Sequence, residues 1–264
     1  MDFAYFLPMN LTFKLILSAV IWMSLASIPL TAQIVNIEKK RIATDSAGWF
    51  GQANISFSGS KNTKQILSLS SGTLLEYKSK NNKDLWLLIT DLSLISADKE
   101  KFSNAGFGHL RYNRKLGEAI RWEVFGQIQY NSLTKIERRL LAGTGPRFKL
   151  TQFDNAKFYL GVAYMYEYEE LTAPVVVHKD NRISSYFSFT LTPEDEVSFT
   201  STLYVQPLLK DAKDYRIASE TSLTLGITKK LSLSSTFRYS YDSMPPLEVP
   251  KSIYAFSNAL EVSF

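Results

Sequence analysis

The sequence contains no cysteine and only two histidines among its 264 residues. Without cysteine the chain cannot form a disulfide, carry a lipid on an N-terminal cysteine or bind zinc through thiolates. The two histidines, His109 and His178, form no histidine cluster with metal-ligand spacing. No glycine-rich phosphate loop precedes a helical pattern either. We therefore expect neither a cofactor nor a metal ion.

The chain also lacks any run of five basic residues, although 30 Lys and Arg against 25 Asp and Glu give a formal net charge of +5. Nucleic-acid binding usually needs such a run or a basic patch, so we expect no nucleic-acid partner. Basic residues such as Lys135 and Lys179 lie among acidic neighbours. They form a solvated rim or, alternatively, meet lipid phosphates.

Only one long apolar run is present, and it follows Lys14 near the start of the chain. It is about 16 residues long and ends at the small residues before Ala32, which is the pattern of a secretory signal peptide. We expect residues 1–32 to be that signal, with cleavage after Ala32 or alternatively after Ala26. A membrane-spanning anchor is the competing interpretation, but the run is shorter than the roughly 20 residues that a spanning helix prefers.

The residues on either side of this run allow two further expectations. Residues 1–8 are apolar and acidic and could be a mis-assigned start, because Met9 begins a more ordinary signal sequence. Residues 33–47 are polar and charged, and we expect them to be a short periplasmic lead.

The C-terminal segment alternates strictly between two kinds of residue. Phe264, Val262, Leu260, Phe256 and Tyr254 share one phase with Asn258, and small or polar residues occupy the other. A period of two is typical of a strand, and an apolar last strand suits a barrel that must close in lipid. An aromatic C-terminus resembles the signal that bacterial barrel-assembly machinery reads. We expect Phe264, Val262 and Leu260 to form this assembly signal.

Comparable alternation recurs along the whole mature chain. In residues 119–131, Ile120, Trp122 and Val124 share one phase, whereas Arg121 and Glu123 share the other. Aromatic residues make up 13% of the chain, as expected where aromatic girdles lie at two membrane interfaces. About twelve strands are predicted, at 49–60, 65–79, 85–97, 104–116, 119–131, 138–150, 157–169, 183–191, 197–206, 216–228, 231–242 and 253–264.

Two of these segments carry irregular signals. Both phases of 85–97 are apolar, so its facing is ambiguous. Pro146 predicts a bulge or a local break within 138–150.

The connections between the strands favour one architecture. With the N-terminus in the periplasm, the longest links, 170–182, 207–215 and 243–252, all lie outside the cell, and the other side has short turns. We predict an all-β fold over 48–264: a transmembrane antiparallel up-and-down β-barrel of about 12 strands, in the outer membrane of a Gram-negative bacterium. A soluble secreted sandwich is the alternative, but sandwich strands are usually shorter.

Polar residues that fall opposite the apolar faces are the candidate interior. They are Arg111, Asn113, Arg121, Glu123, Gln127, Gln129, Glu137, Arg139, Arg147, Glu167, Gln206, Glu220, Arg238 and Asp242. Mixed Arg and Glu across a lumen could line a narrow path for ions or small solutes. Alternatively, they pair with one another and plug the barrel, and a count of twelve strands does not decide between the two.

An outer-membrane lipid-acting enzyme is the third possibility, and His109 is its candidate proton acceptor. Such an enzyme needs a serine, a histidine and an orienting polar group. Asn113 lies four residues from His109, which is about 13 Å along a strand, so it cannot orient the ring directly. We expect His109 to be a polar residue facing the lumen and the protein not to be an enzyme.

Several segments together resemble a known family. GFGHLRYNRKL, WEVFGQIQYN, RRLLAGTGPRFKL, YEYEE, LYVQPLLKDAKDYRIASE and YDSMPP, in this order, are similar to the YdiY-like family of salt-induced outer-membrane proteins of unknown function. The resemblance covers residues 48–264. It implies an outer-membrane barrel and brings no catalytic residues.

These observations lead to an expected role and expected partners. We expect a structural or envelope-stress role, with a narrow pore as the alternative. The expected partners are outer-membrane lipids and lipopolysaccharide, together with the barrel-assembly machinery and periplasmic chaperones during transit.

Overall fold

The computed structural model describes residues 47–61, 65–97, 100–172, 174–194, 196–228 and 231–262. These residues form twelve strands: β1 (Gly48–Lys61), β2 (Gln65–Lys78), β3 (Asp84–Ala97), β4 (Glu100–Lys115), β5 (Ile120–Asn131), β6 (Ile136–Phe153), β7 (Ala156–Thr172), β8 (Val175–Glu194), β9 (Val197–Leu208), β10 (Asp211–Gly226), β11 (Leu231–Asp242) and β12 (Ser252–Val262).

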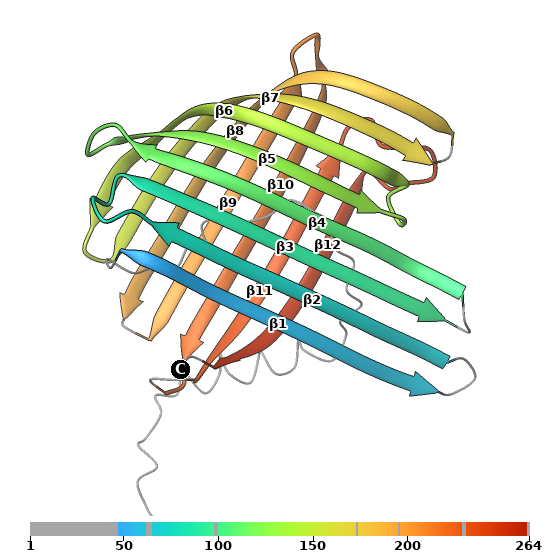
Figure 1. Ribbon diagram of the computed structural model, residues 1–264, viewed down its shortest axis with the longest axis horizontal. Helices are drawn as coiled ribbons and strands as arrows, with labels where there is room; N and C mark the ends of the chain where they lie inside the picture. Colours follow the sequence, from blue (N-terminus) through green and yellow to red (C-terminus); the bar gives the residue numbers. More distant parts are fainter. Residues whose placement is uncertain are drawn as a thin grey trace, which may run out of the picture.

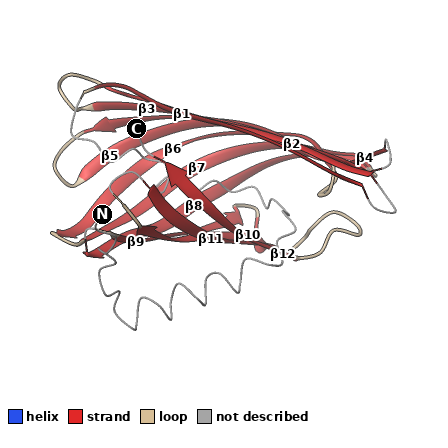
Figure 2. Ribbon diagram, turned by 90° about the horizontal axis from the view of Figure 1, so that it is seen from below, coloured by secondary structure: helices blue, strands red, loops and turns tan. Residues whose placement is uncertain are grey.

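The strands form one sheet in which each strand pairs antiparallel with the next in the sequence, from β1 to β12. The sheet rolls over on itself, so β10 to β12 cross behind β1 to β3 (Figure 1). Turned by 90°, the first and last strands form opposite walls joined through β6 to β8 (Figure 2). No ladder between β1 and β12 is found within the described ranges. The predicted all-β up-and-down barrel of about twelve strands is confirmed.

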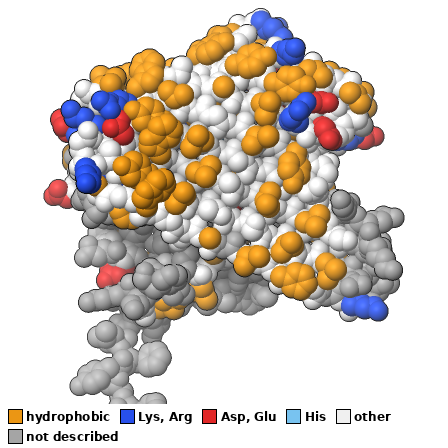
Figure 3. All heavy atoms as spheres, viewed as in Figure 1, with side chains coloured by type: hydrophobic (Ala, Val, Ile, Leu, Met, Phe, Trp, Pro, Cys, Tyr) orange, Lys and Arg blue, Asp and Glu red, His pale blue; other side chains and the backbone are white. Residues whose placement is uncertain are grey.

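Alternating side chains give the rolled sheet an apolar outer face and a mixed inner face. On β5, Trp122, Val124 and Ile128 are 42 to 54% exposed, whereas Glu123 and Gln129 are at most 4% exposed. Figure 3 shows apolar side chains spread over the outer face, with charged side chains near the strand ends. Such an arrangement is the reverse of a soluble protein and is typical of a barrel that faces lipid.

The facing of β3, which is apolar in both phases, is resolved by burial. Leu87 and Ile89 are fully buried, and they pack with Leu74 and Phe107 in one interior cluster. Trp86 and Leu88 are exposed on the outer face. Part of the interior beside β2 to β4 is therefore apolar.

Aromatic rings gather at both ends of the outer face. At one end Trp49 lies 4.8 Å from Tyr77 and Trp86 lies 4.6 Å from Tyr112, measured between ring centroids. At the other end Tyr215 and Tyr241 lie 5.6 Å apart. On β5, Trp122 and Tyr130 bracket the apolar band and are about 27 Å apart along the strand. At a strand tilt of roughly 35–45°, this length corresponds to a height of about 19–22 Å, somewhat less than the roughly 25 Å apolar band of outer-membrane barrels.

Two of the three long links predicted from the sequence are wrong. Residues 170–182 fall mostly in β7 and β8, and residues 207–215 fall mostly in β9 and β10. Residues 174–179 and 209–213 are exposed or half-buried on both faces, so burial imposes no apolar phase on these stretches. The register also shifts between Asp211 and Tyr215, which disturbs the pattern further. Within the part of the chain that the structure describes, only the link between β11 and β12 is a long loop.

The prediction that Glu137 faces the interior is wrong, because strand β6 is irregular at this residue. Glu137 is exposed because the register against β7 shifts between Ile136 and Arg138, which moves the residue between them out of phase. Pro146, by contrast, causes no bulge. The register of β6 against β7 is the same on both sides of it, and the paired positions merely skip Gly145 and Pro146. Proline has no N–H to donate to the ladder.

The described residues contain no helix that is long and apolar enough to cross a membrane. The predicted signal peptide, nearly all of the predicted lead (residues 33–46) and Phe264 lie outside the described residues.

Candidate functional site: the polar interior

Two groups of polar side chains cross the interior of the barrel, and they are the candidate functional site. The first, the Glu167 cluster, comprises Arg139, Glu167, Glu169, Arg182, Asp214, Arg216 and Asp242. The second, the Tyr186 cluster, comprises Arg111, Glu123, Arg147, Tyr159 and Tyr186.

Three arginines from three different strands hold the carboxylate of Glu167, which is 1% exposed. Arg139 Nε lies 3.0 Å from Glu167 Oε1, and Arg182 Nε donates to Oε2 at 2.8 Å. Arg216 on β10 also donates to Oε1. Because β8 and β9 separate β7 from β10 in the sheet, this last bond crosses the interior instead of joining neighbouring strands.

Each of these arginines also contacts a second carboxylate. Arg182 Nη1 lies 3.0 Å from Asp214 Oδ1, and Arg216 Nε donates to Asp242 Oδ2 at 2.9 Å. Arg139 pairs with Glu169 as well. The cluster thus joins four carboxylates to three guanidinium groups and is nearly neutral. Buried charges in a barrel are tolerated when they are paired in this way.

The Tyr186 cluster makes a second crossing of the interior. Tyr186 on β8 donates its hydroxyl to Glu123 Oε2 on β5 at 2.8 Å, although β6 and β7 lie between these strands. Arg147 donates to the same hydroxyl at 3.0 Å, and its guanidinium lies 3.8 Å from the ring centre of Tyr159. Arg111 pairs with Glu123 at 3.0 Å.

A glycine makes room for the Tyr186 ring. Gly161 lies directly opposite Tyr186 in the pairing of β7 with β8. A Cβ at Gly161 would lie 2.1 Å from a ring carbon of Tyr186, closer than any real contact. The absence of a side chain at this position therefore allows the ring to lie across β7 and reach Glu123.

His109 lies beside the Tyr186 cluster and is 3% exposed. Its Nδ1 donates to Gln127 Oε1 at 3.0 Å, and its Nε2 accepts from Arg111 Nε at 3.3 Å. This pattern corresponds to a neutral ring protonated on Nδ1. Phe107 and Phe125 stack on the ring at centroid distances of 6.1 and 5.8 Å.

Eight of the fourteen candidate interior residues, expected to line the lumen, are placed as follows: Arg111, Glu123, Arg147, Glu167 and Glu220 are buried, whereas Arg121, Gln127 and Arg238 are half-buried. Glu220 accepts from Arg238 Nε at 2.6 Å. Whether they line a water-filled lumen stays a prediction. Of the proposed assembly signal, Leu260 is 66% exposed and Val262 pairs with Leu231.

Sequence reasoning missed Arg182, Arg216 and Tyr186 as members of these clusters. Arg182 fell in a predicted link, although it shares its phase with Ser184 and Tyr186 and could have been found from that. Arg216 stood at the edge of a predicted strand. The distant partners carry no signal in one sequence, because the curvature of the whole sheet brings them together.

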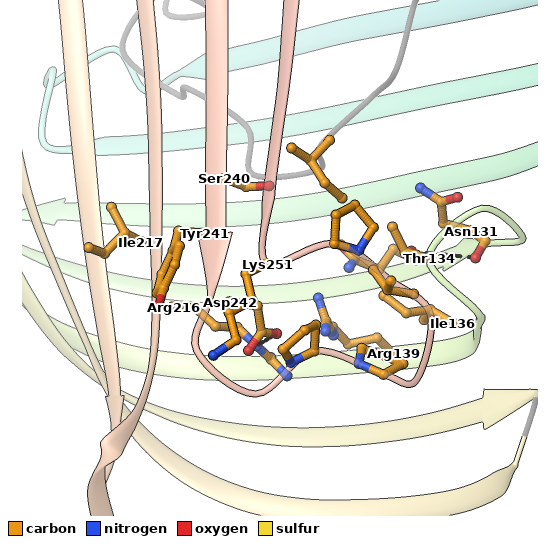
Figure 4. A pocket seen from close by; sticks show the side chains of 16 residues that line it. Asn131, Thr134, Ile136, Arg139, Arg216, Ile217, Ser240, Tyr241, Asp242 and Lys251 are labelled. Carbon is orange, nitrogen blue, oxygen red and sulfur yellow. Dashed lines mark hydrogen bonds and ion pairs between the residues drawn. The ribbon is translucent and has the colours of Figure 1, made fainter.

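A cavity of about 90 Å³ lies next to the Glu167 cluster, beneath the loop of residues 243–251 (Figure 4). Arg139, Arg216 and Asp242 border it from the cluster, and Pro245, Pro246 and Pro250 border it from the loop. The cavity is large enough for several water molecules. Among the described residues, no group of three or more His, Asp or Glu side chains could hold a metal ion.

A family model for proteins of unknown function, DUF481, matches residues 49–264. The chain belongs to the DUF481 family. This is the family of YdiY-like, salt-induced outer-membrane proteins, so the resemblance found in the sequence is confirmed. The chain is also similar to a NanC porin solved in a rhombohedral crystal form, with 11% sequence identity and a TM-score of 0.49. That match covers 81% of this chain and 99% of the porin. Among curated proteins, none matches this chain.

Proposed function

We propose that this DUF481 protein is a structural barrel of the Gram-negative outer membrane, with a role in envelope stress and a lumen that paired side chains keep closed. The observation that carries the proposal is the set of bonds from Glu167 to arginines on three strands, one of which spans the interior. In an open diffusion pore, a nearly neutral bridge of side chains across the lumen would obstruct the passage of solutes.

The outer face of the sheet supports the membrane location. Exposed apolar side chains between two levels of aromatic rings are what a lipid-facing surface requires. Export by the N-terminal signal belongs to the same proposal. Recovery in outer-membrane fractions and a change in gel mobility on heating in detergent are the expected results. A periplasmic protein with unchanged mobility would end the proposal.

A deletion strain tests the envelope role. Loss of the protein is expected to increase sensitivity to osmotic shock and detergent, and expression of the wild-type chain is expected to restore tolerance. A deletion strain that tolerates both stresses like its parent would contradict the role.

A narrow pore is the second candidate, and the cavity beneath residues 243–251 favours it. This space lies at one mouth of the barrel and is bordered by charged groups. A pore would give single-channel steps in planar bilayers, and charge changes at Arg121 or Glu123 would alter its ion preference.

We further propose that the protein is not an enzyme. Both ring nitrogens of His109 are engaged by Gln127 and Arg111, and two phenylalanines cover its faces. Purified protein is expected to release no fatty acid from phospholipid. Release that disappears in His109→Ala would contradict this.

Proposed partners follow from the location. Outer-membrane lipids and lipopolysaccharide would surround the apolar band, and barrel-assembly machinery and periplasmic chaperones would handle the chain in transit. The terminal strand β12 is the element that we expect the machinery to read.

A further inference from the structure

The loop of residues 243–251, here called the strap, lies over the cavity at one mouth of the barrel. Its base is fixed, because Ser243 N donates to Tyr215 O at 3.1 Å and Asp242 N donates to Lys251 O at 2.9 Å. Three prolines, Pro245, Pro246 and Pro250, restrict its backbone. The strap is therefore a stiff segment anchored at its base.

One ion pair ties the strap to the opposite side of the mouth. Lys135 Nζ lies 2.6 Å from Glu248 Oε2, and the two residues are 113 positions apart in the sequence. Glu248 belongs to the strap, whereas Lys135 ends the turn between β5 and β6. The pair spans the cavity mouth instead of bracing one hairpin.

Both partners of this pair have an unusual backbone. Lys135 has φ 59° and Glu248 has φ 67°, and they are two of the three non-glycine residues with positive φ in the described chain. Turn geometry accounts for both values. Val249 N donates to Pro246 O at 3.0 Å, which places Glu248 at the third position of a β-turn, and Lys135 N donates to Ser132 O at 3.3 Å at the end of the turn between β5 and β6. The two turns fix the directions in which the Lys135 and Glu248 side chains leave the backbone.

On the Lys135 side of the ion pair, hydrogen bonds to neighbouring strands hold the turn in place. Thr172 at the end of β7 donates its N–H to Lys135 O at 2.9 Å, and Ser132 N donates to Asn104 O on β4 at 3.0 Å. The turn is thus held by the strands on either side of it. The strap, by contrast, reaches this turn through the Glu248 side chain.

We propose that the strap is a latched lid over the barrel mouth, and that the Lys135–Glu248 ion pair is its latch. When the latch opens, the cavity and the Arg139 and Arg216 side of the Glu167 cluster become accessible from that side of the membrane. This inference rests on the proposed outer-membrane barrel but does not need the lumen to conduct.

The absence of cysteine allows a direct test. A single thiol is introduced by the substitution Ser240→Cys, because Ser240 lines the cavity beneath the strap. Its rate of modification by a neutral, membrane-impermeant polyethylene glycol maleimide is measured in proteoliposomes. Three additional backgrounds are compared: Lys135→Glu, the swap Lys135→Glu with Glu248→Lys, and the control Lys115→Glu. The control breaks an equally exposed turn pair, Lys115–Glu118, away from the strap.

We expect Lys135→Glu to raise the modification rate by about threefold to tenfold, because an exposed ion pair is replaced by like charges. The swap restores the pair and is expected to return the rate to within about twofold of the parent. Lys115→Glu is expected to leave the rate unchanged. An unchanged rate in Lys135→Glu, or a swap as fast as the single change, would overturn the latch. Unchanged gel mobility on heating would instead point to failure of the barrel itself.

Discussion

At the residue scale, the interior depends on Glu167 more than on any other side chain. Its carboxylate neutralises guanidinium groups from β6, β8 and β10, each of which would otherwise be buried with fewer partners. Sequence phase alone placed Glu167 and Arg139 inward. It could not pair them with Arg182 or Arg216, because those contacts depend on how the sheet rolls and how its strands are staggered.

Removing this charge should destabilise the barrel strongly. We expect Glu167→Gln to lower the free energy of unfolding by about 3–5 kcal/mol, the usual cost of breaking a buried ion pair. Denaturant unfolding in detergent micelles measures the change. Glu118→Gln, at a turn residue whose side chain is 91% exposed, is the matched control and should change stability by less than about 0.5 kcal/mol. Equal effects of the two changes would refute the central role of Glu167.

The approach of Tyr186 to Gly161 gives a second residue-level prediction. Gly161→Ala forces the Tyr186 ring away from β7 and weakens its bond to Glu123, which should cost about 1–3 kcal/mol. Gly117→Ala, in a turn where an added Cβ meets nothing within 4 Å, is the control. Unfolding of both variants under the same conditions measures the difference. If Gly161→Ala were as stable as the control, the Tyr186 ring could move aside at no cost, and its close approach to Gly161 would not matter for stability.

At the element scale, sequence alternation located every strand but misjudged where several of them end. In β5 the apolar phase and the strand stop together, so its bounds were predicted within one residue. In β8 the strand continues beyond the apolar phase, through His178 and Lys179. Apolar alternation is expected only where one face of a strand contacts lipid, whereas hydrogen bonding between strands continues beyond that region. The sequence pattern therefore predicts strands that are too short.

The last strand carries a prediction about assembly. Deleting Phe264 or placing Asp at Val262 should reduce insertion, because each change removes apolar character from one phase of the last strand. Ser263→Asp introduces the same charge in the opposite phase and is the control. Surface levels and heat-modifiable protein in membrane fractions measure insertion. Normal levels of both test variants would show that the machinery reads another element.

The latch should respond to acid. The hydrogen bond and the charge of Lys135 hold the pKa of Glu248 below its usual range. A lowered pKa means that the latch is complete above the ordinary glutamate pKa, near 4.3, and is lost as the pH falls through the lower value. Acrylamide quenching of a fluorophore on Ser240→Cys should therefore rise on acidification below about pH 4.

The variant Lys135→Glu serves as the control for this titration. There, protonation relieves repulsion between two carboxylates, so acidification should reduce quenching. A rise of equal size in both proteins would mean that acid loosens the barrel generally and not through the latch.

At the scale of the whole molecule, the barrel has an apolar outer face and an interior that mixes polar and apolar side chains. The Glu167 cluster crosses the interior near the strap, the Tyr186 cluster crosses it on other strands, and an apolar cluster around Leu87 and Ile89 lies on the side formed by β2 to β4. The strand number and the inward phase followed from the sequence. The choice between a plug and a path did not, because it depends on side-chain pairs between strands that are not neighbours.

Single-channel recording of the purified protein in planar bilayers tests the closed lumen most directly. We predict no conductance steps at either polarity and at low or high salt. The same silence is predicted for Lys135→Glu, because both interior crossings remain when the strap is released. Reproducible steps in the wild-type protein, with an ion preference that changes in Arg121→Glu, would contradict the closed lumen and establish a pore.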